Sequence, residues 1–295
     1  LVMPFLPYRV DQYPAGYCAL MVYRRAIEAM QCGVTSIRCV ADRHFADIAV
    51  RNAINKKMLW GPNLVACGMM MIAHNGHSNH NPHSVELSGY DEFLRESRMM
   101  IKAGADFLKI CLTGGMSSAG EGFRDKQMTD DEVRAVVEVA HMSNRKVAVH
   151  IGGDKPIQDA IRLGIDSIEH AYIMSDETAD MLKEADRWLV PTLSVTRAFD
   201  YLAAHGAPSY QVEKLRDAAN YHEDSIRRAI VRDVKIAVGT DLPPSDPVGG
   251  TNATVYEMEC LVHAGMTPIK AINAATGNAA ELCGIHNKTG TLAAG

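Results

Sequence analysis

The sequence predicts an α/β protein folded as a TIM-like (β/α)8 barrel. Helical segments alternate with short, β-branched and apolar segments from about residue 16 onward, and such alternation implies a parallel sheet. No GxGxxG follows the first strand segment, which argues against a doubly wound dinucleotide-binding fold. Barrels of roughly 250 residues are ordinary single domains. The 295 residues are therefore expected to form one domain.

The predicted elements run along the whole chain. Helices are expected at residues 15–33, 46–57, 90–103, 128–144, 155–164, 175–185, 209–233, 251–265 and 267–284. Strands are expected at residues 35–40, 63–68, 106–112, 146–151, 166–171, 188–193 and 235–241. Thr129, followed three residues later by Glu132, predicts a capping box at the fourth helix. Residues 69–83, rich in His, Asn, Ser and Gly, are predicted to be a loop.

The predicted strands number seven, one fewer than a closed barrel needs. The chain begins without methionine, on a loop-like segment and a helix. We therefore expect Leu1 to lie inside a longer polypeptide, with strand 1 before it.

Composition and charge favour small-molecule chemistry. The net charge of −5 and the pI near 6.2 give no electrostatic reason to expect nucleic acid or an anionic membrane as partner. No apolar run approaches the roughly 20 residues of a membrane-spanning helix, and the N-terminal segment does not resemble a signal peptide. We expect a cytoplasmic protein with a small-molecule substrate, and leave a homo-oligomer open. Seven scattered cysteines without a CxxC pair indicate neither a thiolate zinc site nor a disulfide framework.

Four polar residues stand at or near the ends of predicted strands: Lys109, His150, His170 and Asp241. In a parallel barrel, side chains at the C-terminal strand ends converge on one face. Two histidines at matching ends of adjacent strands can share a cation, and neutral imidazole suits zinc. The carboxylate of Asp241 can ligate a metal or move a proton. The alternatives are a core histidine satisfied by a backbone carbonyl and an aspartate that caps a helix.

Lys109 needs its own explanation. Leu108 and Ile110 flank it on a strand expected to be buried, and lysines are almost never fully buried unless paired. Carboxylation by carbon dioxide would turn it into an anionic, bidentate ligand able to bridge two cations. The alternatives are a Schiff-base lysine, as in barrel aldolases, a lysine that holds a phosphate, and a lysine whose head reaches the barrel rim.

Longer segments extend this pattern. They are AGADFLKICLTGG, KVAVHIGG, AIRLGIDSIEHA, WLVPTLSV, VKIAVGTD, VHAGMTPIKAINAATGNAAELCGI and GTLAAG. Through these segments, most of the chain from Gly33 onward resembles the amidohydrolase superfamily, in its imidazolonepropionase-like and Xaa-Pro dipeptidase-like branch. The resemblance implies a metal-dependent hydrolase of amide, peptide-like or cyclic amide C–N bonds.

The resemblance also implies roles for the four residues. Lys109 matches a carboxylated lysine that bridges two divalent metal ions, for which zinc is the default. His150 and His170 match ligands of the second metal, and Asp241 matches a ligand of the first. In the family mechanism the metals lower the pKa of a bridging water and polarise the scissile carbonyl. Asp241 then takes a proton from the attacking hydroxide and passes it to the leaving amine.

Candidate substrate-binding residues lie in three loops. The loop MIAHNGHSNH resembles a histidine-bearing loop of the relatives, in which His77 matches a substrate-binding position. Arg197 and Tyr201, after strand 7, and Asn252, beyond strand 8, are further candidates. The alternative for these three residues is a structural role at the start of a helix.

The sequence departs from the family pattern in three places. It contains no His-x-His pair, which supplies the other ligands of the first metal in the relatives. The small β-sandwich domain is missing, although residues 289–295 are predicted to begin the return to it. Residues 151–153 stand where many dipeptidase-like relatives carry a tyrosine that holds a substrate carboxylate. Two other functions therefore stay open: an incomplete or non-catalytic metal-binding fragment, and a Schiff-base aldolase that uses Lys109.

Overall fold

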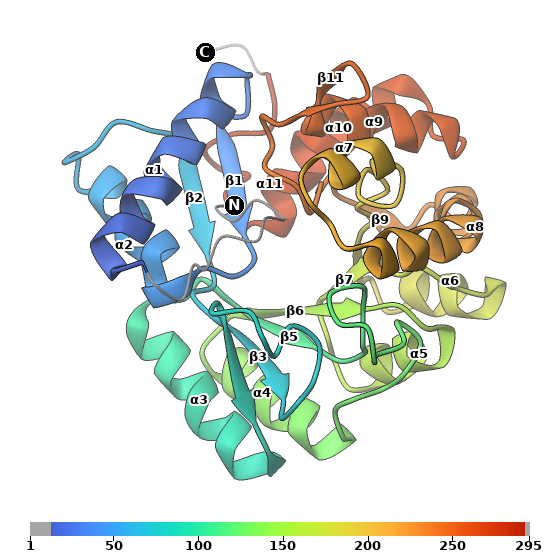
Figure 1. Cartoon of the computed structure of the whole chain (residues 1–295), viewed down its shortest axis with the longest axis horizontal. Coiled ribbons are helices and arrows are strands. Elements are labelled where there is room, and N and C mark those ends of the chain that lie inside the picture. The colour runs from blue at the N-terminus through green and yellow to red at the C-terminus, as the bar shows by residue number, and fades with distance from the viewer. Residues whose placement is uncertain (1–12, 293–295) are drawn as a thin grey trace.

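The strands of the structure, a computed structural model that describes residues 13–292, form a mostly parallel arrangement enclosed by helices (Figure 1). The strands are β1 (Ser36–Cys39), β2 (Asn63–Ala66), β3 (Met70–Ala73), β4 (Ser84–Leu87), β5 (Phe107–Cys111), β6 (Lys146–Ile151), β7 (Ser167–His170), β8 (Trp188–Val190), β9 (Lys235–Ile236), β10 (Pro247–Val248) and β11 (Thr251–Asn252). Seven of them form one sheet in the order β4-β3-β5-β6-β7-β8-β9. The pair β1-β2 is a separate parallel sheet, and β10-β11 is an antiparallel hairpin.

The helices surround these strands. They are α1 (Ala15–Gln31), a short 3-10 helix η2 (Arg43–Phe45), α2 (Ala46–Asn55), α3 (Gly89–Ala103), α4 (Asp130–Met142), α5 (Asp154–Arg162), α6 (Asp176–Glu184), α7 (Phe199–Ala204), α8 (Ser209–Val231), α9 (Ala253–His263), α10 (Pro268–Ala275) and α11 (Gly277–Leu282). None of these helices has the length and hydropathy that a bilayer crossing requires, within the part of the chain that the structure describes.

The predicted α/β class and the parallel strand order are confirmed. Between the described residues, the hydrogen-bond ladders form two parallel sheets and do not close them into one ring. A hydrogen bond of 2.7 Å from the Asp106 N–H to the Ala66 carbonyl joins the end of β2 to the residue before β5. The predicted return segment 289–295 lies partly outside the described residues, and its role stays a prediction.

Two local predictions are wrong. Residues 69–83 are not all loop, because the apolar run Met70–Ala73 pairs with β4 on one side and β5 on the other. The polar residues that follow dominate the composition of this stretch and conceal the four-residue strand. Residues 267–284 form two helices rather than one. Thr276, with φ −121° and ψ −87°, is not helical and separates α10 from α11.

The central strands position the site because both of their faces are buried. Every side chain of β5 and β7 is buried, as are those of β6 after Lys146. Such continuous burial is typical of parallel strands covered by helices outside and by packed side chains inside. The predicted capping box at α4 is confirmed: the Thr129 hydroxyl accepts from the Glu132 N–H, and Glu132 accepts from the Thr129 N–H.

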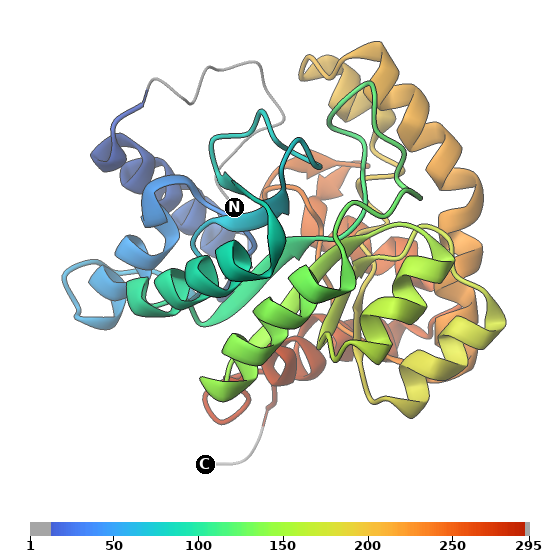
Figure 2. The same ribbon diagram turned by 90° about the horizontal axis from the view of Figure 1, so that it is seen from below.

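Long loops rise on one side of the molecule. Figure 2 shows the β3–β4 loop and the β5–α4 loop on the same side as α7 and the start of α8. The Tyr210 hydroxyl on α8 donates a hydrogen bond of 2.9 Å to the Ser117 carbonyl in the β5–α4 loop. The β5–α4 loop is thereby tied to the start of α8.

Candidate active site

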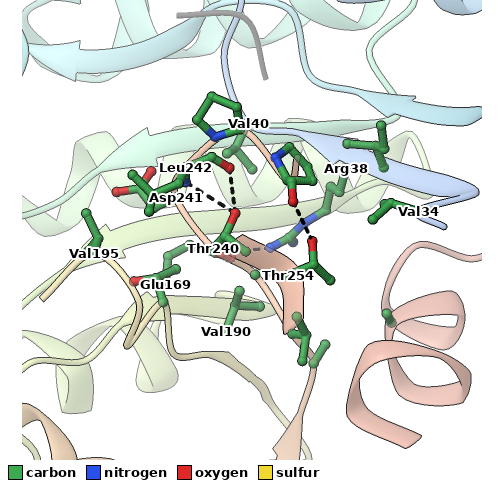
Figure 3. A pocket seen from close by; sticks show the side chains of 18 of the residues that line it. Val34, Arg38, Val40, Glu169, Val190, Val195, Thr240, Asp241, Leu242 and Thr254 are labelled. Carbon is green, nitrogen blue, oxygen red and sulfur yellow. Dashed lines mark hydrogen bonds and ion pairs between the residues drawn. The ribbon is translucent and has the colours of Figure 1, made fainter. Parts of the chain in front are cut away.

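The four strand-end residues predicted from the sequence line one cavity of about 1800 Å³. Lys109 lies within β5, His150 within β6 and His170 at the end of β7, and each is about 5% exposed. Asp241 follows β9, and its surface is open to the cavity. Figure 3 shows Asp241 and Glu169 at the wall of this cavity. The parallel strands thus bring residues far apart in the sequence to one place, as their strand-end positions predict.

Burial sets the protonation of the two histidines. It lowers the pKa of His150 and of His170 well below the usual range, and the nearby charge of Lys109 acts in the same direction on both. Both imidazoles are therefore neutral at neutral pH, which is the form that can coordinate a cation. The cavity wall also desolvates Asp241 and raises its pKa to about 6, against the opposing charges of Lys109 and His77.

Hydrogen bonds occupy one ring nitrogen of each of these two histidines. The Nε2–H of His150 donates to the Gly114 carbonyl at 3.1 Å, because a carbonyl oxygen can only accept. Nδ1 of His150 is then the unprotonated nitrogen. In His170, Nδ1 bonds to the Thr192 hydroxyl at 2.7 Å, and Nε2 is the nitrogen that remains. The two rings meet edge to face with centroids 4.6 Å apart.

The backbone at three successive strand ends adopts the left-handed region. His170, Thr192 and Asp241 have φ values of 74°, 56° and 51°. Residues other than glycine seldom adopt this conformation, and it persists only where the surroundings hold it. The Thr240 hydroxyl bridges Asp241 by bonds to the carbonyl and the N–H of Leu242 (Figure 3).

His222 holds the backbone of His170. It is fully buried on α8, and its Nε2–H donates to the His170 carbonyl at 2.9 Å, while its Nδ1 accepts from the Thr196 hydroxyl at 2.9 Å. Sequence reasoning missed His222. A lone histidine within a long amphipathic helix carries no signal that sets it apart from other helix residues.

His77, which is predicted to bind substrate, also lines the cavity. Its ring stacks on that of His150, with centroids 4.2 Å apart and an interplanar angle of 10°. The close approach depends on Gly115, since a Cβ there would lie 2.3 Å from Cε1 of His77 and 2.9 Å from Nε2 of His150. The two consecutive glycines after the strand around Lys109 are the sequence signal for this approach.

A buried ion pair joins β1 to β7. Arg38 on β1 reaches Glu169 on β7, with 2.7 Å between Nη2 and Oε2 (Figure 3). Arg38 also donates to the Ser167 hydroxyl at 3.1 Å. Their side chains are 13% and 6% exposed. Sequence reasoning missed this pair, although an arginine and a glutamate inside two predicted strand segments were a visible signal.

The other predicted substrate-binding residues differ in position. Asn252 lines the cavity, and its side-chain oxygen also accepts from the Val255 N–H at 3.0 Å at the start of α9. Arg197 pairs with Glu223, and the Tyr201 hydroxyl donates to Asp246. Neither Arg197 nor Tyr201 is part of the cavity wall. The geometry therefore gives no support to a substrate-binding role for these two residues.

The imidazole nitrogens and the carboxylate in this cavity are the types of ligand that bind a divalent cation. They do not by themselves form a complete set of ligands. Among residues 13–292, no three His, Cys, Asp or Glu side chains lie close enough together to hold a metal ion. Two neutral imidazoles and one carboxylate surround Lys109, whose charge acts on the pKa of all three. An ammonium repels a cation, so Lys109 completes the set only after a modification that removes its charge.

Comparisons with known proteins agree with this arrangement. The chain is 31% identical over 291 residues to the ochratoxinase of Aspergillus niger, covering 90% of this chain and 58% of that protein. It is 29% identical over 170 residues to the imidazolonepropionase of Geobacillus kaustophilus, covering 57% of this chain and 35% of that protein. A crystal structure of a Xaa-Pro dipeptidase with bound methionine superposes with a TM-score of 0.84 at 31% identity, over 97% of this chain and 74% of the other.

The chain thus spans less than two thirds of the length of the ochratoxinase that it matches. The profile of the amidohydrolase family matches residues 5–295. The resemblance inferred from the sequence motifs is thereby confirmed. With nearly its whole length matched by that profile, the chain belongs to the amidohydrolase family.

Proposed function

We propose that the protein is a metal-dependent hydrolase of C–N bonds in amides, peptide-like compounds or cyclic amides. The observation that carries this proposal is the convergence of Lys109, His150, His170 and Asp241 on one cavity, with both histidines neutral. Relatives named ochratoxinase, Xaa-Pro dipeptidase and imidazolonepropionase support hydrolysis as the reaction class.

These four residues would hold two divalent cations, with zinc as the first choice because imidazole nitrogen and carboxylate oxygen suit it. Carboxylated Lys109 would bridge the cations, His150 and His170 would bind one, and Asp241 would bind the other. Bound cations of this kind activate water and polarise a carbonyl group.

Asp241 is the proposed proton carrier. Its carboxylate takes a proton from the attacking water and delivers it to the leaving nitrogen as the C–N bond breaks. A carboxylate can both accept and release a proton, which this role requires. The surface of Asp241 opens to the cavity, so a substrate can reach it.

The cavity wall favours a substrate with a bulky apolar group beside the scissile bond. Its apolar side chains include Met116, Tyr172, Val195, Leu215 and Leu242. Within residues 13–292, the lysine and arginine side chains of the wall are those of Lys109 and Arg38, and Arg38 is paired with Glu169. A substrate carboxylate would therefore meet no free guanidinium in this wall, which favours neutral amides over dipeptides.

The test is reconstitution with Zn²⁺ and bicarbonate, followed by metal analysis and turnover of a substrate panel. The panel contains aryl amides, N-acyl amino acids, dipeptides and cyclic imides. We expect bound zinc and hydrolysis of the apolar amides. Lys109→Ala, His150→Ala and His170→Ala should each lose metal from the second site, whereas Lys102→Ala, on the exposed surface of α3, should lose none. Asp241→Asn should mainly lose turnover, and retained turnover would contradict its role as proton carrier.

A second candidate is a metal-binding protein without turnover. It is motivated by the missing His-x-His pair, which supplies the other ligands of the first metal in the relatives. Bound metal without hydrolysis of any amide in the panel would support this candidate. The aldolase alternative predicts that borohydride with a carbonyl compound traps an adduct on Lys109, and trapping there without metal dependence would replace the hydrolase proposal.

A further inference from the structure

A buried carboxylate lies directly behind His77. Oε1 of Glu121, in the β5–α4 loop, is 2.8 Å from Nδ1 of His77, and the two side chains are 7% and 12% exposed. Oε1 also accepts from the Ser118 N–H at 2.9 Å and from the Ser117 hydroxyl at 3.2 Å. Glu121 is not part of the cavity wall, whereas His77 is. The hydrogen bond from His77 therefore links the carboxylate to the cavity.

Glu121 is held in its ionised form. Burial alone would raise its pKa, but the hydrogen bonds from His77, Ser118 and Gly115 outweigh burial and hold the pKa of the carboxyl below its usual range. An ionised carboxylate can only accept hydrogen bonds. Nδ1 of His77 must therefore carry the proton of the 2.8 Å bond.

The remaining nitrogen of His77 is free for the cavity. No described residue bonds to its Nε2, and stacking on His150 fixes the plane of the ring beside the strand-end residues. The backbone is fixed as well, since the His77 N–H donates to the Gln127 side chain at 2.8 Å. A histidine with its backbone, ring plane and Nδ1 all held has one remaining polar atom to offer a substrate.

Hydrogen bonds from α8 hold the segment that contains Glu121. The ammonium group of Lys214 donates to the Ser118 and Glu121 carbonyls, and Tyr210 donates to the Ser117 carbonyl. The segment that supplies the carboxylate is thus tied to a helix on the same side of the molecule (Figure 2). Side chains whose neighbours lock them in this way meet the requirement for a preorganised site.

We propose that Glu121 is a positioning residue, which fixes His77 in its Nδ1–H tautomer so that Nε2 faces the cavity and contacts the substrate next to Asp241. This assignment rests on the proposed function for its catalytic meaning. The tautomer itself does not depend on activity, and it can be measured separately.

The first test is long-range ¹H–¹⁵N NMR of protein labelled at histidine nitrogen, in which Nδ1–H and Nε2–H tautomers give different cross-peak patterns. The His77→Asn variant assigns the His77 signals. We expect wild-type His77 as the Nδ1–H tautomer, and a mixture or reversal in Glu121→Ala. The matched control is Glu86→Gln, since Glu86 accepts from the Asn75 N–H at 2.7 Å in the same β3–β4 region without touching His77. An Nε2–H tautomer in the wild type, or an unchanged tautomer in Glu121→Ala, overturns the proposal.

The second test is kinetic and uses the amide that the panel shows to be hydrolysed. Glu121→Gln should lower kcat by about 10- to 100-fold, as expected for partners that orient a functional histidine. KM should change less than kcat, and Glu86→Gln should match the wild type. An unchanged kcat in Glu121→Gln counts against the positioning role. If the wild type hydrolyses no amide, the proposed function fails, and the NMR test still decides whether Glu121 sets the tautomer.

Discussion

The buried pair of Arg38 and Glu169 gives the most direct test of how the strands are held together. Arg38→Met removes the guanidinium while keeping much of the apolar length of the side chain. Glu169, 6% exposed, is then left beside Ser167 without its cationic partner. Because β1 and β7 belong to different sheets, the loss is expected to weaken the contact between the two sheets.

The magnitude follows from the burial of the pair. Removing one partner of a buried ion pair typically costs about 3–5 kcal/mol of unfolding free energy, because the other charge stays buried and uncompensated. Both side chains line a cavity that water can enter, so the lower end, about 3 kcal/mol, is expected here. Adding Glu169→Gln removes the uncompensated charge. The double variant should therefore be more stable than Arg38→Met alone.

Urea unfolding followed by tryptophan fluorescence measures this effect, with buried Trp188 on β8 as a reporter next to β7. The matched control is Arg24→Met, which breaks an ion pair to Glu28 of 2.8 Å on the surface of α1, where Arg24 is 80% exposed. Exposed pairs contribute about 0–1 kcal/mol. The reasoning is refuted if Arg38→Met costs no more than Arg24→Met, or if the double variant is less stable than the single one.

Three further predictions test other parts of the site. Gly115→Ala should lower kcat by about a hundredfold, since its Cβ would lie 2.3 Å from Cε1 of His77 and displace that ring; an unchanged kcat would show that the stacked rings are not needed. Tyr201→Phe should change KM less than about threefold, because the hydroxyl bonds to Asp246 outside the cavity, and a larger rise measured by steady-state kinetics would restore a substrate role. Burial raises the pKa of Glu257 to about 7 from an ordinary 4.5, so its contribution to stability is present below pH 4.5 and is lost as the pH rises to 7. Thermal melting should show the wild type losing stability relative to Glu257→Gln between pH 5 and 7.5, and parallel pH profiles would contradict this.

Much of the fold could be predicted from the sequence because its strands are buried on both faces. The segment KVAVHI, between an amphipathic helix with a capping box and a second helix, has few other interpretations. The strands Met70–Ala73 and Ser84–Leu87 could not be predicted in the same way. They are four residues each, no helix separates them, and the polar loop between them dominates the local composition. β3 also pairs with β5, which lies more than 30 residues away from it in sequence.

The candidate site was predictable only where a residue type contradicts its surroundings. A lysine between Leu108 and Ile110, and histidines at matching strand ends, conflict with the apolar strands that carry them. Glu121 and His222 show no such conflict. Glu121 lies in a polar loop and His222 in an amphipathic helix, where charged and polar residues are ordinary. Their roles depend on contacts with His77 and His170, which only the folded chain creates.

The charges of the site explain why metal binding and modification of Lys109 should be coupled. Desolvation leaves His150 and His170 neutral, so they add no negative charge that could attract a cation. Glu169 is already paired with Arg38, and the positive charge of Lys109 acts to lower the pKa of Asp241. Carboxylation would change Lys109 from a positive to a negative group and so reverse the sign of the charge at the centre of these ligands. Zinc uptake should therefore rise with bicarbonate concentration in the wild type and be independent of bicarbonate in Lys109→Ala.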